Sequence, residues 1–180
     1  MDSLRGKLLI SSPALFDPNF RRTIVLIAHH DEEGAMGLVL NRPADELPVA
    51  VAAPQLTSLV DGDEPVHVGG PVSPESLMVL AEFTDPADAA APVVGDIGFV
   101  PADAEPDELD TRRARVYAGY AGWGAGQLED ELDEGSWIVE EVEADDPFAA
   151  DPDALWRDVL QRKGGGFALL STMPLDPSQN

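Results

Sequence analysis

The sequence contains no cysteine among its 180 residues. Disulfide bonds, thiolate metal sites and thiol nucleophiles are therefore excluded, and we expect a protein of the reducing cytoplasm. No apolar run approaches the ~18 residues of a membrane span. The opening residues resemble a signal peptide only briefly, because Ser11, Ser12 and Pro13 interrupt the apolar run. We expect a soluble chain that does not associate with membranes.

Basic residues are scarce. Eleven Lys and Arg stand against 34 Asp and Glu, which gives a formal net charge of −23. No Lys or Arg occurs between Arg42 and Arg112, or between Arg115 and Arg157. A phosphate backbone is bound through a basic patch, so we do not expect direct DNA or RNA binding. The acidity is either a solvated surface suited to a salty cytosol or a docking face for a basic partner.

Signatures of common catalytic sites are missing as well. The sequence has no G-x-S-x-G elbow and no Walker-type loop. His29 and His30 are adjacent, and successive strand residues point to opposite faces, so they cannot easily share a metal ion. His67 stands alone in "PVHVGG" and is interpreted as an ordinary, half-buried strand residue. We expect neither a metal nor a cofactor.

Short apolar, β-branched runs bounded by turn formers predict strands at 6–11 and 23–29. The turn "HDEEGA" predicts a hairpin with Gly34 at a positive φ, which leads into a third strand, "MGLVLN". Further strands are predicted at 65–72, 76–83, 97–100, 113–120 and 136–142.

Two helices are predicted, at 127–134 with Gly135 as the C-terminal cap and at 153–163 with an amphipathic face. We expect an irregular segment at 44–60 with a short helix near Pro54, and a surface loop at 83–96. The fold class is therefore α/β (α+β), a single domain over residues 1–180 with a mixed sheet flanked by helices. Its core spans about 6–163, followed by a C-terminal tail, 164–180.

The stretch "AGYAGWGAGQLEDEL" places several glycines between a predicted strand and a predicted helix. Its spacing is G-x-G-x-G, and the bulky Trp123 is expected inside the turn. Glu129, Asp130 and Glu131 fill the first helical turn, where a phosphate would otherwise bind the free amides. The stretch favours a close-packed structural turn over a nucleotide loop.

"NRP" at 41–43 places Arg42 at the end of an apolar strand in a protein short of bases. Its guanidinium would either clamp a carboxylate or phosphate or form an internal salt bridge with one of the many acids. Arg21 and Arg22 carry the same two interpretations.

Four stretches, "SSPALFDPNFRRTIVLI", "HDEEGAMGLVLNRP", "HVGGPV" and "AGYAGWGAGQLEDEL", resemble the UPF0301 family, also called AlgH or YqgE-like proteins. The resemblance runs in order from about Gly6 to the final "LWRDVL" helix. It implies a bacterial, cytosolic, single-domain α/β protein. Some members are labelled putative transcriptional regulators, and the family has no agreed catalytic residues.

Our first hypothesis is a non-enzymatic binding or regulatory protein that takes a small anion or a protein partner. Its pocket is expected where the third strand, the Gly-Gly-Pro turn and the Gly-Trp turn meet. Arg42 would bind the anion, Asn41 and Gln127 would orient it, and Trp123 would supply an apolar wall. Gly69 and Gly70 complete this predicted site.

Two alternatives remain open. An enzyme would use Asp17, His30 or Asp31 as general acid or base, with one of them within reach of Arg42 and with a perturbed pKa. A transcriptional regulator of this charge would act indirectly, through a protein partner.

Overall fold

The computed structural model describes residues 2–173. Its strands are β1 (Lys7–Ser11), β2 (Ile24–Asp31), β3 (Gly34–Val39), β4 (Pro43–Pro48), β5 (Pro65–Val68), β6 (Val72–Phe83), β7 (Ala91–Val94), β8 (Ile97–Phe99), β9 (Thr111–Gly124) and β10 (Trp137–Glu141). Its helices are α1 (Val49–Ala52), α2 (Gln127–Asp133), α3 (Leu155–Lys163) and α4 (Gly166–Leu170). Within this part of the chain, no helix is long and apolar enough to cross a membrane.

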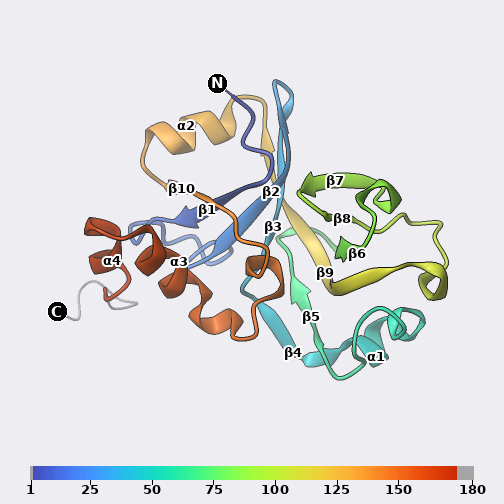
Figure 1. Ribbon diagram of the computed structural model, residues 1–180. Coiled ribbons are helices and arrows are strands. Elements are labelled where there is room, and N and C mark those ends of the chain that lie inside the picture. Colours follow the sequence, from blue (N-terminus) through green and yellow to red (C-terminus); the bar gives the residue numbers. More distant parts are fainter. Residues whose placement is uncertain (1, 174–180) are drawn as a thin grey trace.

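The strands form one sheet in the order β10-β1-β2-β3-β9-β6-β8-β7, in which every neighbouring pair is antiparallel (Figure 1). β5 lies off this path, antiparallel to β4 and parallel to β9, so the sheet is mixed as the sequence predicts. The β2–β3 hairpin is confirmed, because Asp31 pairs with Gly34 and Gly34 has a φ of +141°. The long β9 connects the two halves of the sheet, pairing with β3, β5 and β6.

Helices cover both faces of the central strands, because alternate residues of β1 and β2 are apolar on each side. Leu8 and Ile10 pack in one cluster with Trp156 and Val159 of α3. Leu9 packs on the other face in a second cluster. That cluster also contains Trp123, Leu128 of α2 and Trp137. This two-sided burial explains why β1 and β2 are continuously apolar rather than alternating.

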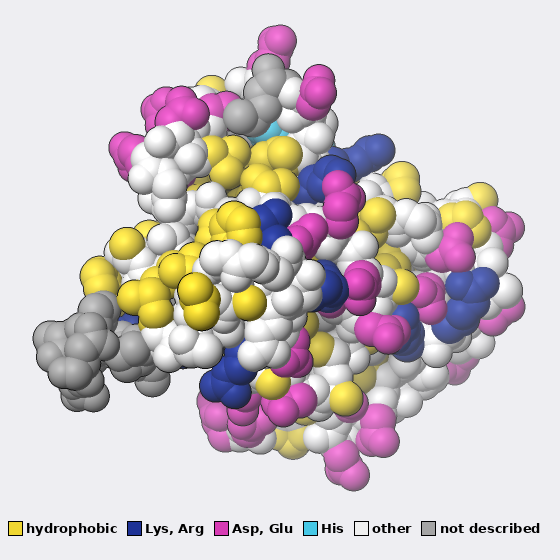
Figure 2. Space-filling view, turned by 60° about the vertical axis from the view of Figure 1, so that its left-hand side comes forward, with side chains coloured by type: hydrophobic (Ala, Val, Ile, Leu, Met, Phe, Trp, Pro, Cys, Tyr) yellow, Lys and Arg dark blue, Asp and Glu magenta, His cyan; other side chains and the backbone are white. Residues whose placement is uncertain are grey.

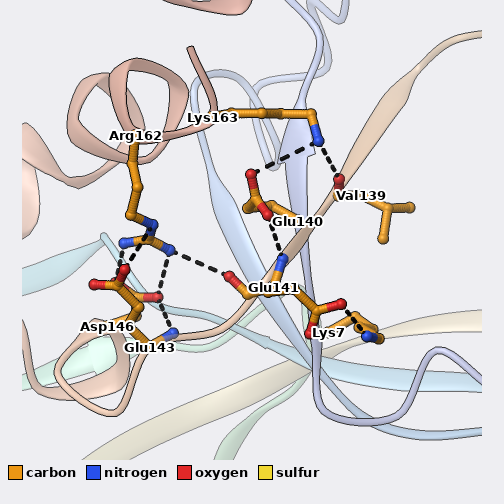
Figure 3. Close-up of polar contacts among 8 residues, drawn as sticks. All are labelled: Lys7, Val139, Glu140, Glu141, Glu143, Asp146, Arg162 and Lys163. Carbon is orange, nitrogen blue, oxygen red and sulfur yellow. Dashed lines mark hydrogen bonds and ion pairs between the residues drawn. The ribbon is translucent and has the colours of Figure 1, made fainter.

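The C-terminal end of α3 is tied to β10 and to the segment that follows it (Figure 3). The Arg162 guanidinium donates to both carboxylate oxygens of the buried Asp146, at 3.0 and 2.9 Å, and to the Glu141 carbonyl at 3.2 Å. Lys163 Nζ donates to the Val139 carbonyl at 3.0 Å. These contacts fix the short 3-10 turn Asp146–Phe148 against the sheet.

Two predicted loops are partly strands. Pro43–Pro48 forms β4 and Ala91–Val94 forms β7, and both were wrongly assigned to irregular structure. Each pairs with one neighbour, β4 with β5 and β7 with β8. Proline is tolerated in edge strands because the missing N–H faces no partner, so the prolines that indicated loops are compatible with these edges.

The remaining differences concern where elements end. A short helical turn does lie at Pro54, after α1. β9 continues to Gly124, so Trp123 lies on a strand and not in the turn, where the sequence placed it. Within the expected C-terminal tail, residues 166–170 form α4, whose Phe167 and Leu170 pack against the α3 cluster. Residues 174–180 lie outside the described part.

Candidate functional site

The Gly-Gly corner, which follows β5, lies between β3 and β9. Gly69 N–H donates to the Ala118 carbonyl at 2.8 Å, and its own carbonyl accepts from Val39 N–H at 2.8 Å. A Cβ on Gly70, whose φ is +156°, would lie 2.2 Å from the Tyr120 carbonyl oxygen. Only glycine permits that approach. A Cβ on Gly69 would likewise lie 2.3 Å from the Gly119 carbonyl oxygen, so both glycines have a structural role whatever binds beside them.

Arg42 lines a hollow of about 170 Å³ next to this corner, together with Asn19, Val39, Val68, Gly70, Pro71 and Pro74. We call it the Arg42 hollow. The side chain is half-buried, and its Nη2 donates to the Arg21 carbonyl at 3.0 Å. Among residues 2–173 no carboxylate lies within ion-pair distance of it, so the internal salt bridge considered for Arg42 does not form there. Burial lowers the pKa of Arg42, and nearby Asp17 opposes that shift.

Further arginines surround the start of β2. Burial lowers the pKa of Arg22, and repulsion from Arg21 and Arg157 lowers it further, so these cations lie close together. The Arg22 guanidinium stacks over the Trp156 ring at 4.6 Å. Arg21, Arg22 and Arg157 therefore form a cluster of positive charge in a strongly acidic chain. Figure 2 shows acidic side chains dispersed over one face of the molecule, with Lys and Arg side chains among them.

The other predicted site residues are held by structural contacts. Asn41 Oδ1 accepts from Ile24 N–H at 3.0 Å, and its Nδ2 donates to the Arg22 carbonyl at 2.8 Å. Gln127 Oε1 accepts from Gly124 N–H at 3.0 Å at the start of α2. Asn41 thus fixes the entry to β2, and Gln127 closes the β9–α2 turn.

Trp123 is buried in an aromatic group with Phe20 and Trp137, at ring centroid distances of 6.2 and 6.0 Å. It borders a different, shallow hollow together with His29 and Asp31. The structure therefore brings Arg42 and Gly70 together in one hollow and leaves Trp123 and Gln127 elsewhere.

His30 anchors the N-terminal segment to α2. Its Nδ1 accepts from Leu4 N–H at 2.9 Å, so Nε2 carries the hydrogen and donates to Glu129 Oε1 at 2.6 Å. This hydrogen bond lowers the pKa of Glu129. As the sequence predicts, the two adjacent histidines face opposite ways, with His29 exposed and His30 buried.

Neither of the other acid–base candidates is enclosed. Asp31 is exposed, and hydrogen bonds from Glu33 N–H and His29 lower its pKa. Asp17 is also exposed and accepts from Asn19 N–H at 2.9 Å. Asp17 is near Arg42, whereas His30 and Asp31 line a hollow beside Glu129. The three candidates thus do not share one site.

A larger hollow, of about 670 Å³, is lined in part by His67, which was interpreted from the sequence as an ordinary, half-buried strand residue. We call it the His67 hollow; it is lined by Pro43, Asp45, Asp61, Asp63, Glu64, Pro65, His67, Arg115, Phe148, Ala150, Asp151, Pro152 and Asp153. His67 is 1% exposed. Its Nδ1 lies 3.3 Å from the Pro65 carbonyl, and within the described residues its Nε2 has no hydrogen-bond partner.

The tautomer of His67 follows from these contacts. Burial, reinforced by the Arg115 charge, lowers the pKa of His67 to about 4, so the ring is neutral near pH 7. A carbonyl only accepts, so Nδ1 carries the hydrogen and Nε2 presents a lone pair. His67, which lines the hollow, therefore has a buried acceptor with no donor among residues 2–173.

Arg115 and Tyr117 of β9 connect the His67 hollow to the 3-10 turn held by Asp146. Arg115 is buried, with Nη1 3.2 Å from the Ala149 carbonyl and Nη2 3.7 Å from Glu64. Tyr117 OH donates to the Pro147 carbonyl at 2.9 Å, and burial raises its pKa. An arginine in the apolar run "ARVY" was the sequence signal for this region, because buried arginine needs partners.

Residues 8–168 match the family model DUF179, described as AlgH-like. The chain belongs to the AlgH-like family. It is 45% identical over 188 residues to a UPF0301 protein of Streptomyces coelicolor, covering 100% of this chain and 97% of the relative. A UPF0301 protein of Chlorobaculum tepidum is 36% identical over 182 residues, with 97% and 95% covered.

Two solved structures have the same fold. A crystal structure of a Corynebacterium diphtheriae protein superposes with a TM-score of 0.87 at 26% identity, covering 96% of this chain and 93% of that one. The solution structure of the AlgH protein from Pseudomonas aeruginosa gives 0.73 at 28% identity, with 97% of each chain covered. The family resemblance and the fold class inferred from the sequence are confirmed.

Proposed function

We propose that this AlgH-like protein is a binding protein with a regulatory role, and that it recognises an anionic group at Arg42. One observation carries the proposal: the Arg42 guanidinium is half-buried and bonded to a backbone carbonyl, with no carboxylate partner in residues 2–173. Arg112, by contrast, pairs with Asp96. A guanidinium left with unused donors in a desolvated place is suited to a carboxylate or phosphate.

The size of the Arg42 hollow limits what it holds. Pockets for whole small molecules enclose roughly 300–1,000 Å³, and this one has about 170 Å³. It therefore accommodates one anionic group and not an entire metabolite. A single guanidinium in so small a hollow favours one acidic side chain of a partner or a small anion.

Binding accounts for the acid–base candidates better than catalysis does. His30 is engaged by Leu4 and Glu129, and the exposed Asp31 carboxylate accepts from Glu33 N–H at 2.8 Å. A general base needs a substrate within hydrogen-bond reach, and a pKa near the working pH favours its action. The pKa of the exposed Asp31 is lowered, which takes it further below a neutral working pH.

Arg42→Ala tests the proposal, with Arg112→Ala as a control that removes the same charge at an exposed ion pair. The probes are inorganic phosphate and malonate at constant ionic strength. Because a ligand that binds only the folded state raises its stability, we expect both anions to raise the melting temperature of the wild type and of Arg112→Ala, and not of Arg42→Ala. Equal shifts in all three proteins, or no shift in the wild type, would refute the proposal.

Any effect on transcription is proposed to occur through a protein partner in the cytoplasm and not by direct contact with DNA. The formal net charge of −23 supports this, because most of the molecule repels a phosphate backbone. Gel shifts at low salt, where nonspecific affinity is greatest, should show no DNA retention. Clear retention would overturn this assignment.

A further inference from the structure

The His67 hollow has the opposite charge from the Arg42 hollow. Its lining contains six carboxylates and one guanidinium, that of Arg115. Of the six, only Glu64 has an ion-pair partner within the described residues, at 3.7 Å from Arg115. Carboxylates close together repel one another, and a cation placed among them relieves that repulsion. The electrostatics of the His67 hollow therefore select a cation.

His67 adds a requirement for hydrogen-bond donors. Its Nε2 is a buried lone pair without a partner in residues 2–173. Such an unpaired group costs the folded state about 1–3 kcal/mol. An N–H of a ligand removes that cost, whereas a carboxylate or carbonyl oxygen cannot, because two acceptors repel. The buried ring is independent of the acidic rim and points to the same class of ligand.

The walls favour an organic cation over a metal ion. Within residues 2–173 no three His, Asp or Glu side chains are arranged to coordinate one ion. The volume of about 670 Å³ falls in the usual range for small organic ligands. Pro43, Pro65, Phe148 and Pro152 give the hollow apolar surface for an alkyl chain.

We propose that the His67 hollow binds a small organic cation with N–H donors, an alkylamine or alkylguanidinium. One nitrogen donates to His67 Nε2, and the cationic groups lie among the carboxylates of Asp45, Asp61, Asp63, Asp151 and Asp153. This assignment does not depend on the function proposed for Arg42, because the two hollows share no lining residue.

Calorimetric titration of the full chain with agmatine tests the assignment. The key variant is Asp61→Asn with Asp63→Asn, and its matched control is Asp103→Asn with Asp107→Asn, two exposed acids outside the hollow. We expect saturable binding of agmatine to the wild type and to the control, with dissociation constants within twofold of each other. The Asp61/Asp63 variant is expected to bind agmatine at least tenfold more weakly. Absence of binding to the wild type, or equal weakening in both variants, would overturn the assignment.

Two further titrations isolate the donor requirement. Tetramethylammonium has the charge of an amine without an N–H, and we expect it to bind the wild type at least tenfold more weakly than agmatine. His67→Leu removes the acceptor and is expected to weaken agmatine binding at least tenfold. If the leucine variant fails to fold, the comparison of tetramethylammonium with agmatine still tests whether the ligand needs an N–H donor. Equal affinities for the two cations would contradict the role of His67.

Discussion

His67 is neutral in the folded protein because burial and the nearby Arg115 charge both disfavour its imidazolium form. Its pKa is lowered from the ordinary value of 6.5 to about 4. Between these two pH values His67 is protonated in the unfolded chain and neutral in the folded protein. The stability that His67 contributes is therefore complete above about pH 6.5 and is lost as the pH falls toward 4.

A His67→Gln variant should lose this part of the pH dependence. A shift from 6.5 to about 4 corresponds to a stability difference on the order of 3 kcal/mol at 1.36 kcal/mol per pH unit. Urea unfolding at pH 7 and at pH 4 should show the wild type losing more stability than the variant by about this amount. Neighbouring titratable groups are common to both proteins: Asp45, Asp61, Asp63, Glu64, Arg115, Tyr117, Asp151 and Asp153. Parallel losses would show that His67 is not the responsible group.

Helix α3 helps to hold the wall of the His67 hollow in place through Arg162. Arg162 holds Asp146, and the turn that begins at Asp146 presents the carbonyls that bind Tyr117 and Arg115. Asp146 raises the pKa of Arg162, as expected for an ion pair. Arg162 and Asp146 do not line the hollow, but they keep its wall in place.

Asp146→Asn should therefore be costly. It leaves Arg162 without its buried partner, and removing one member of a buried pair typically costs about 3 kcal/mol. Lys7→Gln is the control, because the Lys7–Glu141 pair is exposed and such pairs contribute at most ~1 kcal/mol. Denaturant unfolding of both variants measures the difference in free energy of unfolding. Equal small losses would show that the Arg162–Asp146 pair does not stabilise the fold.

Local signals in the sequence predicted elements, and contacts between distant segments determined the rest. The hairpin at Gly34 and the helix ended by Gly135 follow from turn chemistry within a few residues. β4 and β7 were missed because their prolines indicate loops unless a pairing partner is known. The His67 hollow combines segments near residues 45, 64, 115 and 151, so no single motif describes it. Arg42 and Trp123 were expected together, yet β9 carries Trp123 into the core.

For the whole molecule, the formal net charge of −23 is a source of self-repulsion in the compact state. Salt screens such repulsion, with a Debye length that falls from about 10 Å at 0.1 M to about 3 Å at 1 M. The melting temperature should therefore rise when NaCl is increased from 0.05 to about 1 M. Thermal unfolding monitored by circular dichroism, without denaturant, measures this change. A fall in melting temperature would show that stabilising ion pairs outweigh the repulsion between carboxylates.

Charges of opposite sign gather at two places, with arginines around the start of β2 and carboxylates around the His67 hollow. Selective recognition at Arg42 is the central claim of this account. Its most direct test is an NMR titration of arginine-labelled protein with inorganic phosphate, observing the Nε–Hε resonances. We expect the Arg42 resonance to shift saturably while that of Arg112 stays in place. No shift at Arg42, or equal unsaturable shifts at all arginines, would contradict the claim.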